Sequence, residues 1–528
     1  MPGSPNMEMF IEELITLCGA EHVVVAQSSD ESHCTSGVRR DVPATVYPAS
    51  KDDVVKILSL ANRHVVPLHP VSTGRNWGYG GDSPVTDGAV ILNLSRLTRI
   101  LGYDPVLGVV TIEPGVTQGQ LSQFLIEQGD KFACFVTGSS PECSLIGNAL
   151  ERGYGANPPT DHFSAVMSLT AVLPDGSVYQ PLMAELGGGQ SDRLYRWGVG
   201  PYLDGLFSQS GLGVVTSMTL MLSPQFEETA IVMFDPGADT SLSDLVEMIR
   251  AVRLKTSDCL ISLKILNQLY LTALGGLHLD PSVPVSAEAY ADLGRKNMIP
   301  AYKVIGMIGG TRGQVKATIK DIKRVMKSYK GRALVLTQSQ TKLISRLISL
   351  PVVSSLVPAS ISDQLKLLGR SYDLIRGKPS EKMLELAYWK QGHVTNEAGL
   401  HPARDGCGLL WMPFIVPNKG VETETLHRVI SDKIWAAGLE PLMGLTHLNQ
   451  ASSVMLYGLI YERETYQDKI KALHQEITEL VRASGLMAYR LHVDEIAGLP
   501  KDNTAHEMMR VLKARFDPGN IVSRGRFD

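Results

Sequence analysis

The chain has 528 residues, of which 44% are hydrophobic and 20% charged, and its formal net charge at pH 7 is -4. This length exceeds what one hydrophobic core usually holds, so we expect two domains. The charge balance argues against nucleic acid or an anionic membrane as partner, because both require a strongly basic surface.

The cysteines and the N-terminal residues bear on the compartment. Six cysteines are scattered along the chain without a C-x-x-C pair or a neighbouring histidine, which predicts free thiols in a reducing compartment and no metal site. Glu8, Glu12 and Glu13 occupy the stretch where a signal peptide needs apolar residues. We therefore expect a cytoplasmic protein.

Two stretches have an unusual composition. Residues 344–362 are apolar but contain Arg346, two prolines and several serines, which favours a buried helix and loop over a membrane span. In residues 316–332, lysines alternate with Ile, Val and Met at helical spacing. That pattern predicts a solvated helix face, with a partner-binding surface as the alternative.

The N-terminal block reads as alternating helices and strands. Ser50 and Asp53 begin a capped amphipathic helix that ends near residue 64, and a short strand over 65–72 follows it. We expect strands at 89–94 and 108–115, the latter as the second arm of a hairpin, and then a helix over 117–128. Asp175-Gly176 predicts a hairpin turn within 163–181, and a further strand over 212–224 closes the block.

From about residue 225 the pattern changes to longer helices separated by strands, such as 260–266 and 408–416. The chain ends with a helix halted by Pro518-Gly519 and a short extended tail. The fold class that these elements indicate is α+β.

The segment "STGRNWGYGG", residues 72–81, contains four glycines in ten positions. Glycines allow main-chain N–H groups to converge on an anion and allow a ligand to approach where a Cβ would clash. The segment is neither a P-loop nor a G-x-G-x-x-G motif. By itself it fits a tight structural turn as well as a ligand cradle.

Two further glycine-bearing loops, 145–163 and 197–216, lie in the same block. Three such loops suggest a long ligand laid across the domain, and a dinucleotide is the natural candidate.

The segments 47–81, 89–100, 108–117, 146–155 and 200–216, together with the final "LKARFDPGNI", resemble the vanillyl-alcohol oxidase and para-cresol methylhydroxylase family of FAD enzymes. The resemblance runs over nearly all of 40–224 and again from about 485 to 528. It implies a two-part FAD-binding domain, residues 1–224 and 485–528, with an α+β substrate-binding cap domain inserted at 225–484.

The resemblance also assigns cofactor-binding residues, with the loop at 72–81 holding the FAD pyrophosphate through backbone N–H donors. These residues are Ser72, Thr73, Gly74, Arg75, Asn76, Gly78, Ser139, Ser144, Gly147, Asn148, Gly153, Gly155, Asp161, His162, Gly213, Val214 and Val215. For His162, a structural role in bonding the loop backbone is favoured over catalysis.

The catalytic candidates are Tyr79, Tyr489 and Arg490, which match the family positions that bind a phenolic oxygen. Two hydroxyl donors and a guanidinium stabilise a phenolate and lower its pKa. A phenolate releases a hydride from its para side-chain carbon to the flavin, which leaves a quinone methide that water can attack. Taken singly, each tyrosine also fits a packing role.

The resemblance therefore implies an FAD-dependent oxidase or dehydrogenase acting on CH-OH or CH groups of a para-substituted phenol. The alternatives are a non-phenolic alcohol, hydroxy acid or biosynthetic intermediate as substrate, or a flavin-binding protein without turnover. The electron acceptor is oxygen or a separate cytochrome, and a homodimer would be common for the family.

The sequence departs from the family at the positions that tether the flavin. Gly408 and Asn76 stand where relatives carry a bond-forming side chain, so we expect non-covalent FAD unless His401 or Cys407 lies within reach. Ser139 occupies the position of an acidic residue near the flavin, and Glu142 is its candidate substitute as a base for water attack.

Overall fold

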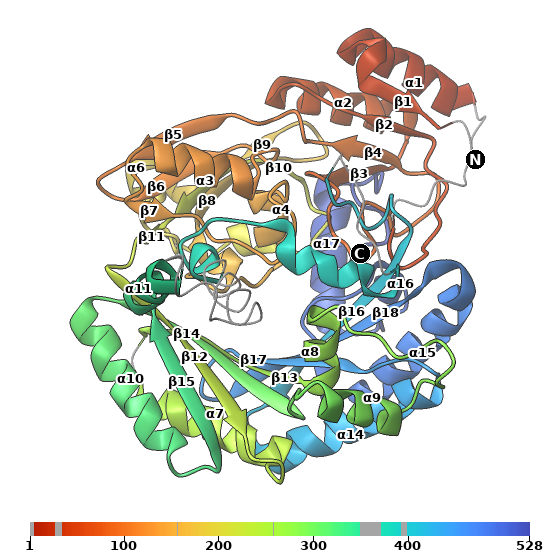
Figure 1. Ribbon diagram of the computed structural model, residues 1–528. Helices are drawn as coiled ribbons and strands as arrows, with labels where there is room; N and C mark the ends of the chain where they lie inside the picture. Colours follow the sequence, from red (N-terminus) through yellow and green to blue (C-terminus); the bar gives the residue numbers. More distant parts are fainter. Residues whose placement is uncertain are drawn as a thin grey trace. The chain divides into compact units, whose positions relative to one another are not determined.

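The computed structural model describes residues 5–26, 34–155, 157–256, 258–348, 371–391 and 399–527 (Figure 1). The chain divides into two compact units. Unit 1 comprises Met1–Gly155, Asp161–Pro224 and Leu491–Asp528, and unit 2 comprises Ala156–Thr160 and Gln225–Arg490.

Unit 1 contains a four-stranded sheet of mixed direction. Its strands, in spatial order, are β1 (Val23–Val25), β2 (Ala44–Val46), β4 (Val90–Asn93) and β3 (Leu68–Val71). β1 is antiparallel to β2, whereas β4 is parallel to both β2 and β3. Helices α1 (Pro5–Cys18) and α2 (Lys51–His64) share one hydrophobic core with this sheet. The Ser50 side chain caps α2 by accepting a hydrogen bond from the Asp53 N–H, which confirms the predicted helix start.

A five-stranded antiparallel sheet forms the second layer of unit 1. Its strands, in spatial order, are β5 (Ile100–Asp104), β6 (Val109–Ile112), β10 (Val214–Met221), β8 (Val166–Val172) and β9 (Val178–Tyr179). The predicted hairpin turn at Asp175-Gly176 joins β8 to β9. The expected hairpin of 89–94 with 108–115 is wrong. β6 pairs with β5 across a turn that ends at Gly108, and β4 belongs to the other sheet because its apolar side chains are buried there between parallel strands.

Shorter elements connect these sheets. They are η1 (Ala20–His22), α3 (Gln118–Glu127), β7 (Phe132–Ala133), α4 (Leu145–Leu150), η2 (His162–Ala165), α5 (Leu182–Glu185), α6 (Gly189–Asp192), η3 (Asp204–Phe207), β11 (Ser223–Pro224), α16 (Val493–Ala497) and α17 (Thr504–Phe516). The C-terminal tail returns to the first sheet, where the Leu68 N–H donates to the Ile521 carbonyl at 2.6 Å and the Ser523 N–H to the Leu68 carbonyl at 2.8 Å. The first and last parts of the chain therefore form one unit.

Unit 2 is built on one eight-stranded antiparallel sheet. Its strands, in spatial order, are β15 (Gly331–Thr337), β12 (Glu228–Pro236), β14 (Tyr302–Gly310), β13 (Leu260–Asn267), β17 (Leu442–His447), β18 (Ser452–Glu462), β16 (Cys407–Pro417) and β19 (Met487–Ala488). Because β19 pairs with β16, unit 2 extends beyond residue 484 to Arg490.

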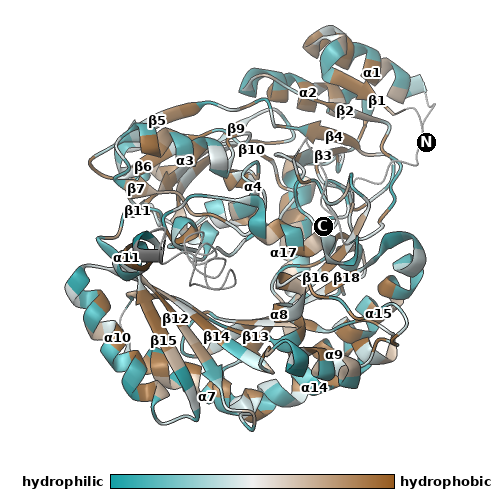
Figure 2. Cartoon of the chain, in the orientation of Figure 1, coloured by the Kyte–Doolittle hydropathy of each residue, from teal (hydrophilic) through white to brown (hydrophobic). Residues whose placement is uncertain are grey.

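Helices α7 (Leu242–Lys255), α10 (Arg312–Met326), α14 (Gly420–Ala436) and α15 (Arg463–Ala483) share the largest hydrophobic core with one face of this sheet (Figure 1). We call this the helix-covered face and the other the second face. Ile231, Met233 and Ile305 lie on the second face, where they pack with Tyr372 and Ile375. Both faces thus bury apolar side chains, in agreement with the hydrophobic colouring of β12 and β14 in Figure 2.

The remaining elements of unit 2 are α8 (Gln268–Leu274), α9 (Ala287–Lys296), α11 (Gln338–Ile348) and η4 (Glu381–Gln391). In the predicted segment 344–362, α11 covers the first residues, and those from 349 onward lie outside the described part of the chain.

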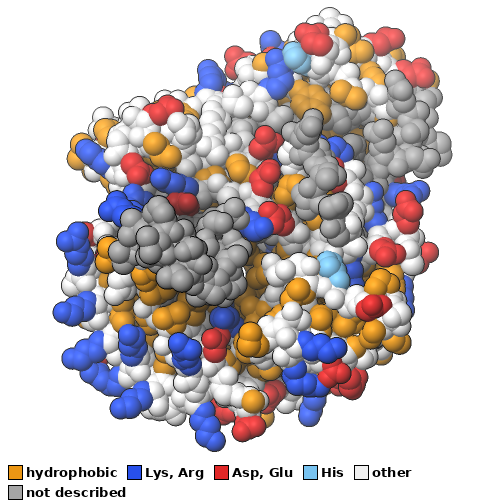
Figure 3. Space-filling view, in the orientation of Figure 1, with side chains coloured by type: hydrophobic (Ala, Val, Ile, Leu, Met, Phe, Trp, Pro, Cys, Tyr) orange, Lys and Arg blue, Asp and Glu red, His pale blue; other side chains and the backbone are white. Residues whose placement is uncertain are grey.

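The basic stretch at 316–332 begins within α10. This helix buries Val315, Ile322 and Met326, while Lys316, Lys320 and Lys323 are exposed. Figure 3 shows the corresponding row of Lys and Arg side chains along the edge where α10 lies. The solvated helix face predicted from the spacing is therefore confirmed.

The six cysteines are free thiols, as predicted. Within the described residues, no group of His, Cys, Asp and Glu is arranged to hold a metal ion. Among the helices that the structure describes, none combines the length and hydropathy that crossing a membrane requires.

Candidate functional site

The first glycine loop, residues 72–81, follows β3 in unit 1. Gly74, Gly78, Gly80 and Gly81 all have positive φ angles, between 63° and 119°, which side chains other than glycine rarely tolerate. Among the described residues, the N–H groups of residues 73–75 donate no hydrogen bond. Consecutive N–H groups with unused hydrogen-bonding capacity form a cradle for an anion.

The second glycine loop lies directly against the first. The Ser144 N–H donates to the Thr73 hydroxyl at 3.2 Å, and a Cβ added to Gly147 would lie 3.0 Å from Ser72 Oγ. Glycine at 147 therefore permits α4 to approach the cradle closely. Arg75 forms an ion pair with Glu142, whose side chain is 65% exposed. This pairing gives Glu142 a structural partner, while the Ser139 hydroxyl accepts a hydrogen bond from the Cys143 thiol at 3.1 Å.

The third glycine loop, residues 197–216, is hydrogen-bonded to the second. The Gln209 N–H donates to the Leu150 carbonyl at 2.9 Å, and Arg152 donates to the Ser208 hydroxyl at 2.8 Å. A Cβ on Gly211 would lie 3.0 Å from the Val522 carbonyl oxygen, so this loop also touches the C-terminal tail. The structure thus brings the three loops together within unit 1.

The residues at the end of the second loop hold its backbone. His162 Nδ1 is hydrogen-bonded to Asn148 Oδ1, and the His162 N–H donates to the Gly153 carbonyl at 3.1 Å. A Cβ on Gly153 or on Gly155 would come within 2.2 Å of Asn148 or His162, respectively. Asp161 accepts a hydrogen bond from the Phe163 N–H. These contacts support the structural role that the sequence favours for His162.

Gly213, Val214 and Val215 lie at the start of β10. Val214 is 1% exposed and belongs to the hydrophobic core of unit 1, and a Cβ on Gly213 would lie 2.9 Å from the Val172 carbonyl oxygen. The Val214 side chain is therefore a packing residue, so any contact of this residue with a ligand would use its backbone.

A buried ion pair that the sequence analysis missed holds the C-terminal tail, residues 517–527, against the third loop. Lys513 Nζ lies 2.8 Å from Asp517 and donates to the Gly211 carbonyl at 2.7 Å, while Asp517 accepts the N–H groups of Ile521 and Val522 at 2.9 Å. The sequence signal was the lysine and aspartate four residues apart at the end of the last helix, which we interpreted only as a helix stop.

Tyr79 is half-buried and lies in unit 1. Its carbonyl accepts a hydrogen bond from the Val493 N–H at 3.1 Å. Gly80 comes so close to Val493 that an added Cβ would lie 2.6 Å from Val493 Cγ1. Sequence reasoning missed Val493, which secures the end of the first loop.

Tyr489 and Arg490 lie in unit 2. The Tyr489 N–H donates to the Pro413 carbonyl at 3.3 Å, which continues the pairing of β19 with β16. Ala488 is opposite Phe414 and packs on the helix-covered face, so alternation places Tyr489 on the second face. Arg490 is buried, with 9% of its surface exposed.

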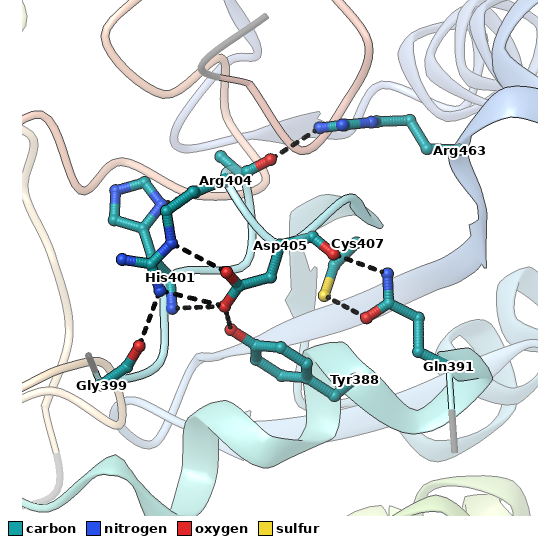
Figure 4. A network of polar contacts seen from close by, with 9 residues as sticks. Tyr388, Gln391, Gly399, His401, Arg404, Asp405, Cys407 and Arg463 are labelled. Atoms are coloured by element: carbon teal, nitrogen blue, oxygen red, sulfur yellow. Dashed lines mark hydrogen bonds and ion pairs between the residues drawn. The ribbon is translucent and has the colours of Figure 1, made fainter. Parts of the chain in front are cut away.

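Gly408, which stands where relatives carry a flavin-tethering side chain, lies on the helix-covered face of the sheet. Gly408 is opposite Tyr461, which belongs to the helix-covered core, and a Cβ at 408 would lie 2.2 Å from the Tyr461 carbonyl oxygen. Alternation instead turns Cys407 toward the second face. Its thiol donates to Gln391 Oε1 at 3.4 Å (Figure 4).

Cys407 and His401 belong to a polar network in unit 2 (Figure 4). Tyr388 donates to Asp405 at 2.6 Å, and the Arg404 N–H donates to His401 Nδ1 at 3.1 Å. Burial raises the pKa of the Cys407 thiol to about 12, and Asp405 contributes in the same direction. A thiol with so high a pKa is a poor nucleophile.

A second polar cluster, also missed from the sequence, lies beside the third loop. The Tyr179 hydroxyl donates to Asp204 at 2.6 Å, and the two residues line a small hollow of about 20 Å³ with Asp192 and Arg196. Burial raises the pKa of Asp204 to about 6, and Asp192 adds to the shift. The sequence signal was a pair of acidic residues, Asp192 and Asp204, that flank a stretch with two arginines and several aromatic residues.

The comparisons with known proteins agree with this geometry. Residues 42–180 match the family model described as "FAD binding domain", and that range contains the first two glycine loops. The chain is 30% identical to 1'-carboxy-chondrochloren decarboxylase of Chondromyces crocatus, over 97% of this chain and 95% of that protein. It is 24% identical to the 4-cresol dehydrogenase [hydroxylating] flavoprotein subunit of Pseudomonas putida, over 92% of this chain and 87% of that protein.

Solved structures share the fold. A substrate-bound p-cresol methylhydroxylase has a TM-score of 0.85 at 22% identity, over 99% of this chain and 96% of that one. The 4-ethylphenol oxidase of Gulosibacter chungangensis, in complex with isoeugenol, has the same score and identity, over 99% of this chain and 97% of that one.

Proposed function

Since this chain belongs to the vanillyl-alcohol oxidase and para-cresol methylhydroxylase family of FAD-dependent oxidoreductases, we propose that it removes a hydride from the para side-chain carbon of a phenolic substrate. FAD, when bound, supplies the acceptor for that hydride. The steps that remain to the protein are to hold the cofactor, to stabilise the phenolate and to decide what happens to the oxidised product.

Unit 1 has the features that FAD binding requires. The unused N–H groups of residues 73–75 suit the pyrophosphate, and Gly147 allows the second loop to approach them. Ser144, Asn148 and the other cofactor-binding candidates of the three loops would complete the site. We assign unit 1 as the FAD-binding domain and unit 2 as the substrate-binding cap.

The proposed phenol-binding groups are Tyr79, Tyr489 and Arg490. Two hydroxyl donors and a permanently charged guanidinium favour the ionised phenol, which makes loss of a para hydride easier. The observation that carries this proposal is that all three residues stand at the family positions in order, and within unit 1 the hydrogen bond from the Val493 N–H fixes the backbone of Tyr79.

The quinone methide that follows has two productive outcomes. Attack by water on the oxidised carbon yields a hydroxylated product. In the second outcome, the neighbouring carbon carries a carboxylate: the bond to that carboxylate breaks, its electron pair forms an alkene and restores the aromatic ring, and CO₂ leaves. The similarity to a decarboxylase over almost the whole chain favours the second outcome as a candidate function.

The FAD is proposed to be non-covalent. Gly408 has no side chain, and a Cβ at this position would collide with the Tyr461 carbonyl oxygen. The high pKa of the Cys407 thiol keeps its sulfur protonated. The electron acceptor is proposed to be oxygen or a second protein, in keeping with the oxidase and the "flavoprotein subunit" among the relatives.

Anaerobic flavin reduction by 4-hydroxybenzyl alcohol, its 4-methoxy analogue and D-lactate tests this proposal. Only the free phenol should bleach the flavin, because the methyl ether cannot ionise. Arg490→Met should slow that reduction by roughly 10²- to 10³-fold, the usual loss for one charge-stabilising donor, with Arg490→Lys retaining part of the rate. Equal reduction by the ether, or reduction by D-lactate alone, would support the hydroxy-acid alternative. Release of CO₂ from a phenol with a side-chain carboxylate identifies the second outcome.

A further inference from the structure

Lys264 lies on β13, in the interior of the sheet of unit 2. Its neighbours along the strand, Leu263 and Ile265, belong to the helix-covered core, so Lys264 faces the second face. It is directly opposite Ile305 on β14 and Thr446 on β17. Residues opposite each other in an antiparallel pair share a face, which places the ammonium among the groups of the second face.

In the part of the chain that the structure describes, Lys264 has no counter-ion. Ile305 belongs to the apolar group that packs against Tyr372 and Ile375. Among the described residues, no hydrogen bond or ion pair involves the Lys264 side chain, and burial lowers the pKa of its amine without help from a neighbouring charge.

Three other partly or fully buried lysines among the described residues are paired with a carboxylate. Lys303 lies 3.0 Å from Asp235, Lys390 2.5 Å from Glu440 and Lys513 2.8 Å from Asp517. Lys264 is partly buried. An ammonium that is partly withdrawn from water without a partner destabilises the protein, and a ligand that brings a negative charge removes that cost. Among the described residues, Lys264 therefore differs from these three lysines in lacking an anion.

From this placement we infer that Lys264 binds a carboxylate at the far end of the substrate side chain. The inference rests on the proposed function, because it takes the second face of the unit 2 sheet as the wall of the substrate site. One ammonium neutralises one negative charge, and the Thr446 hydroxyl on the adjacent strand is a suitable second donor to a carboxylate.

The strand register gives the distance between Lys264 and the end of the sheet that carries Tyr489, one of the proposed phenol-binding residues. The row of paired residues that starts at Lys264 runs through Thr446, Val454 and Ile415 to Met487, two residues before Tyr489. Four strand spacings of about 4.8 Å amount to roughly 19 Å between the two ends of this row. The carboxylate at Lys264 is thus remote from the oxidised carbon, and the substrate class is a para-substituted phenol with an extended, acid-terminated side chain.

The experiment uses ω-(4-hydroxyphenyl)alkanoic acids of increasing chain length, each with its primary amide. Binding to the oxidised holoenzyme is measured by calorimetry, and flavin reduction is measured separately. We expect the longer acids to bind more tightly than their amides by roughly 10- to 100-fold, the range of a hydrogen bond to a charged group. Lys264→Met should abolish that preference, while Lys264→Arg should retain part of it.

Lys303→Met is the matched control, because it removes a positive charge from the same sheet where Asp235 already pairs it. It should keep the preference for the acid. Equal affinity of acids and amides in the unmodified enzyme, or an unchanged preference in Lys264→Met, overturns the inference, and the first comparison needs no variant to fold. If the acids bind through Lys264 but no phenol reduces the flavin, the proposed reaction fails while the anion site stands.

Discussion

The candidate ligand sites in the loops of unit 1 and on the sheet of unit 2 are built from different groups. In unit 1 the candidate cofactor site consists mainly of backbone groups: N–H donors at 73–75 and glycines that allow close approach. In unit 2 the candidate substrate wall consists of side chains on one face of a sheet, among them Tyr489 and Lys264. A backbone site tolerates no added Cβ, whereas a side-chain site depends on which residue each strand position presents.

The largest effect in this comparison is expected from adding one methyl group to the first loop. Alanine at Gly80 would adopt φ +119° and place its Cβ 2.6 Å from Val493 Cγ1, so Gly80→Ala strains the loop that holds Tyr79. Backbone strain of this kind costs roughly 1–3 kcal/mol, which corresponds to about a 5- to 150-fold loss of FAD affinity where it disturbs the cradle. The dissociation constant of FAD, measured by flavin fluorescence, checks this.

Gly129→Ala is the matched control for that variant. Gly129 also has a positive φ, +99°, but a Cβ there meets no atom within 4 Å. It should retain FAD. Equal loss of FAD from both variants would show that the approach to Val493 is irrelevant and that only general stability matters.

The next prediction tests a side-chain network in unit 1, the pair formed by Tyr179 and Asp204. The pKa of Asp204 is raised from 3.8 to about 6, chiefly by burial, so the folded protein favours the protonated acid. Its stabilising contribution is complete below the unfolded pKa and is lost as the pH rises through about 6, a cost of up to about 3 kcal/mol. Asp204→Asn should therefore increase the free energy of unfolding more at about pH 8 than at about pH 4, as measured by denaturant titration.

The exposed turn residue Asp175 provides the comparison for this prediction. Hydrogen bonds from Ser177 hold the pKa of the Asp175 carboxyl below its ordinary value. Asp175→Asn should produce no gain at high pH. A gain for Asp204→Asn that is the same at both pH values would mean that burial does not control this carboxyl.

The smallest effect is expected at Cys407 in unit 2. If FAD is non-covalent, acid precipitation should release the yellow colour into the supernatant, and Cys407→Ser should behave in the same way as the unmodified protein. Burial keeps the thiol protonated, with a pKa of about 12, so it should form no bond to the flavin. Colour that stays in the pellet for the unmodified protein but not for Cys407→Ser would contradict this prediction.

Features that depend on local chemistry were predicted well. Ser50 caps α2, Asp175-Gly176 turns the β8–β9 hairpin, and the glycine loops gather in unit 1. The pairing of residues 108–115 was wrong, because an apolar run such as β4 fits a hairpin arm as well as a buried parallel strand. The roles of Tyr79, Tyr489 and Arg490 stay predictions.

The sequence by itself determined the fold class, the two-part organisation suggested by the change of pattern at about 225, and the family, because glycines, caps and turn residues act over a few neighbouring positions. Only the tertiary structure decided that Gly408 packs against Tyr461, that the Val493 N–H donates to the Tyr79 carbonyl, and that Lys264 lies on the second face without a counter-ion among the described residues. These facts depend on strand register and on contacts between residues far apart in the chain, and a shift of one residue in register would reverse the face of every side chain.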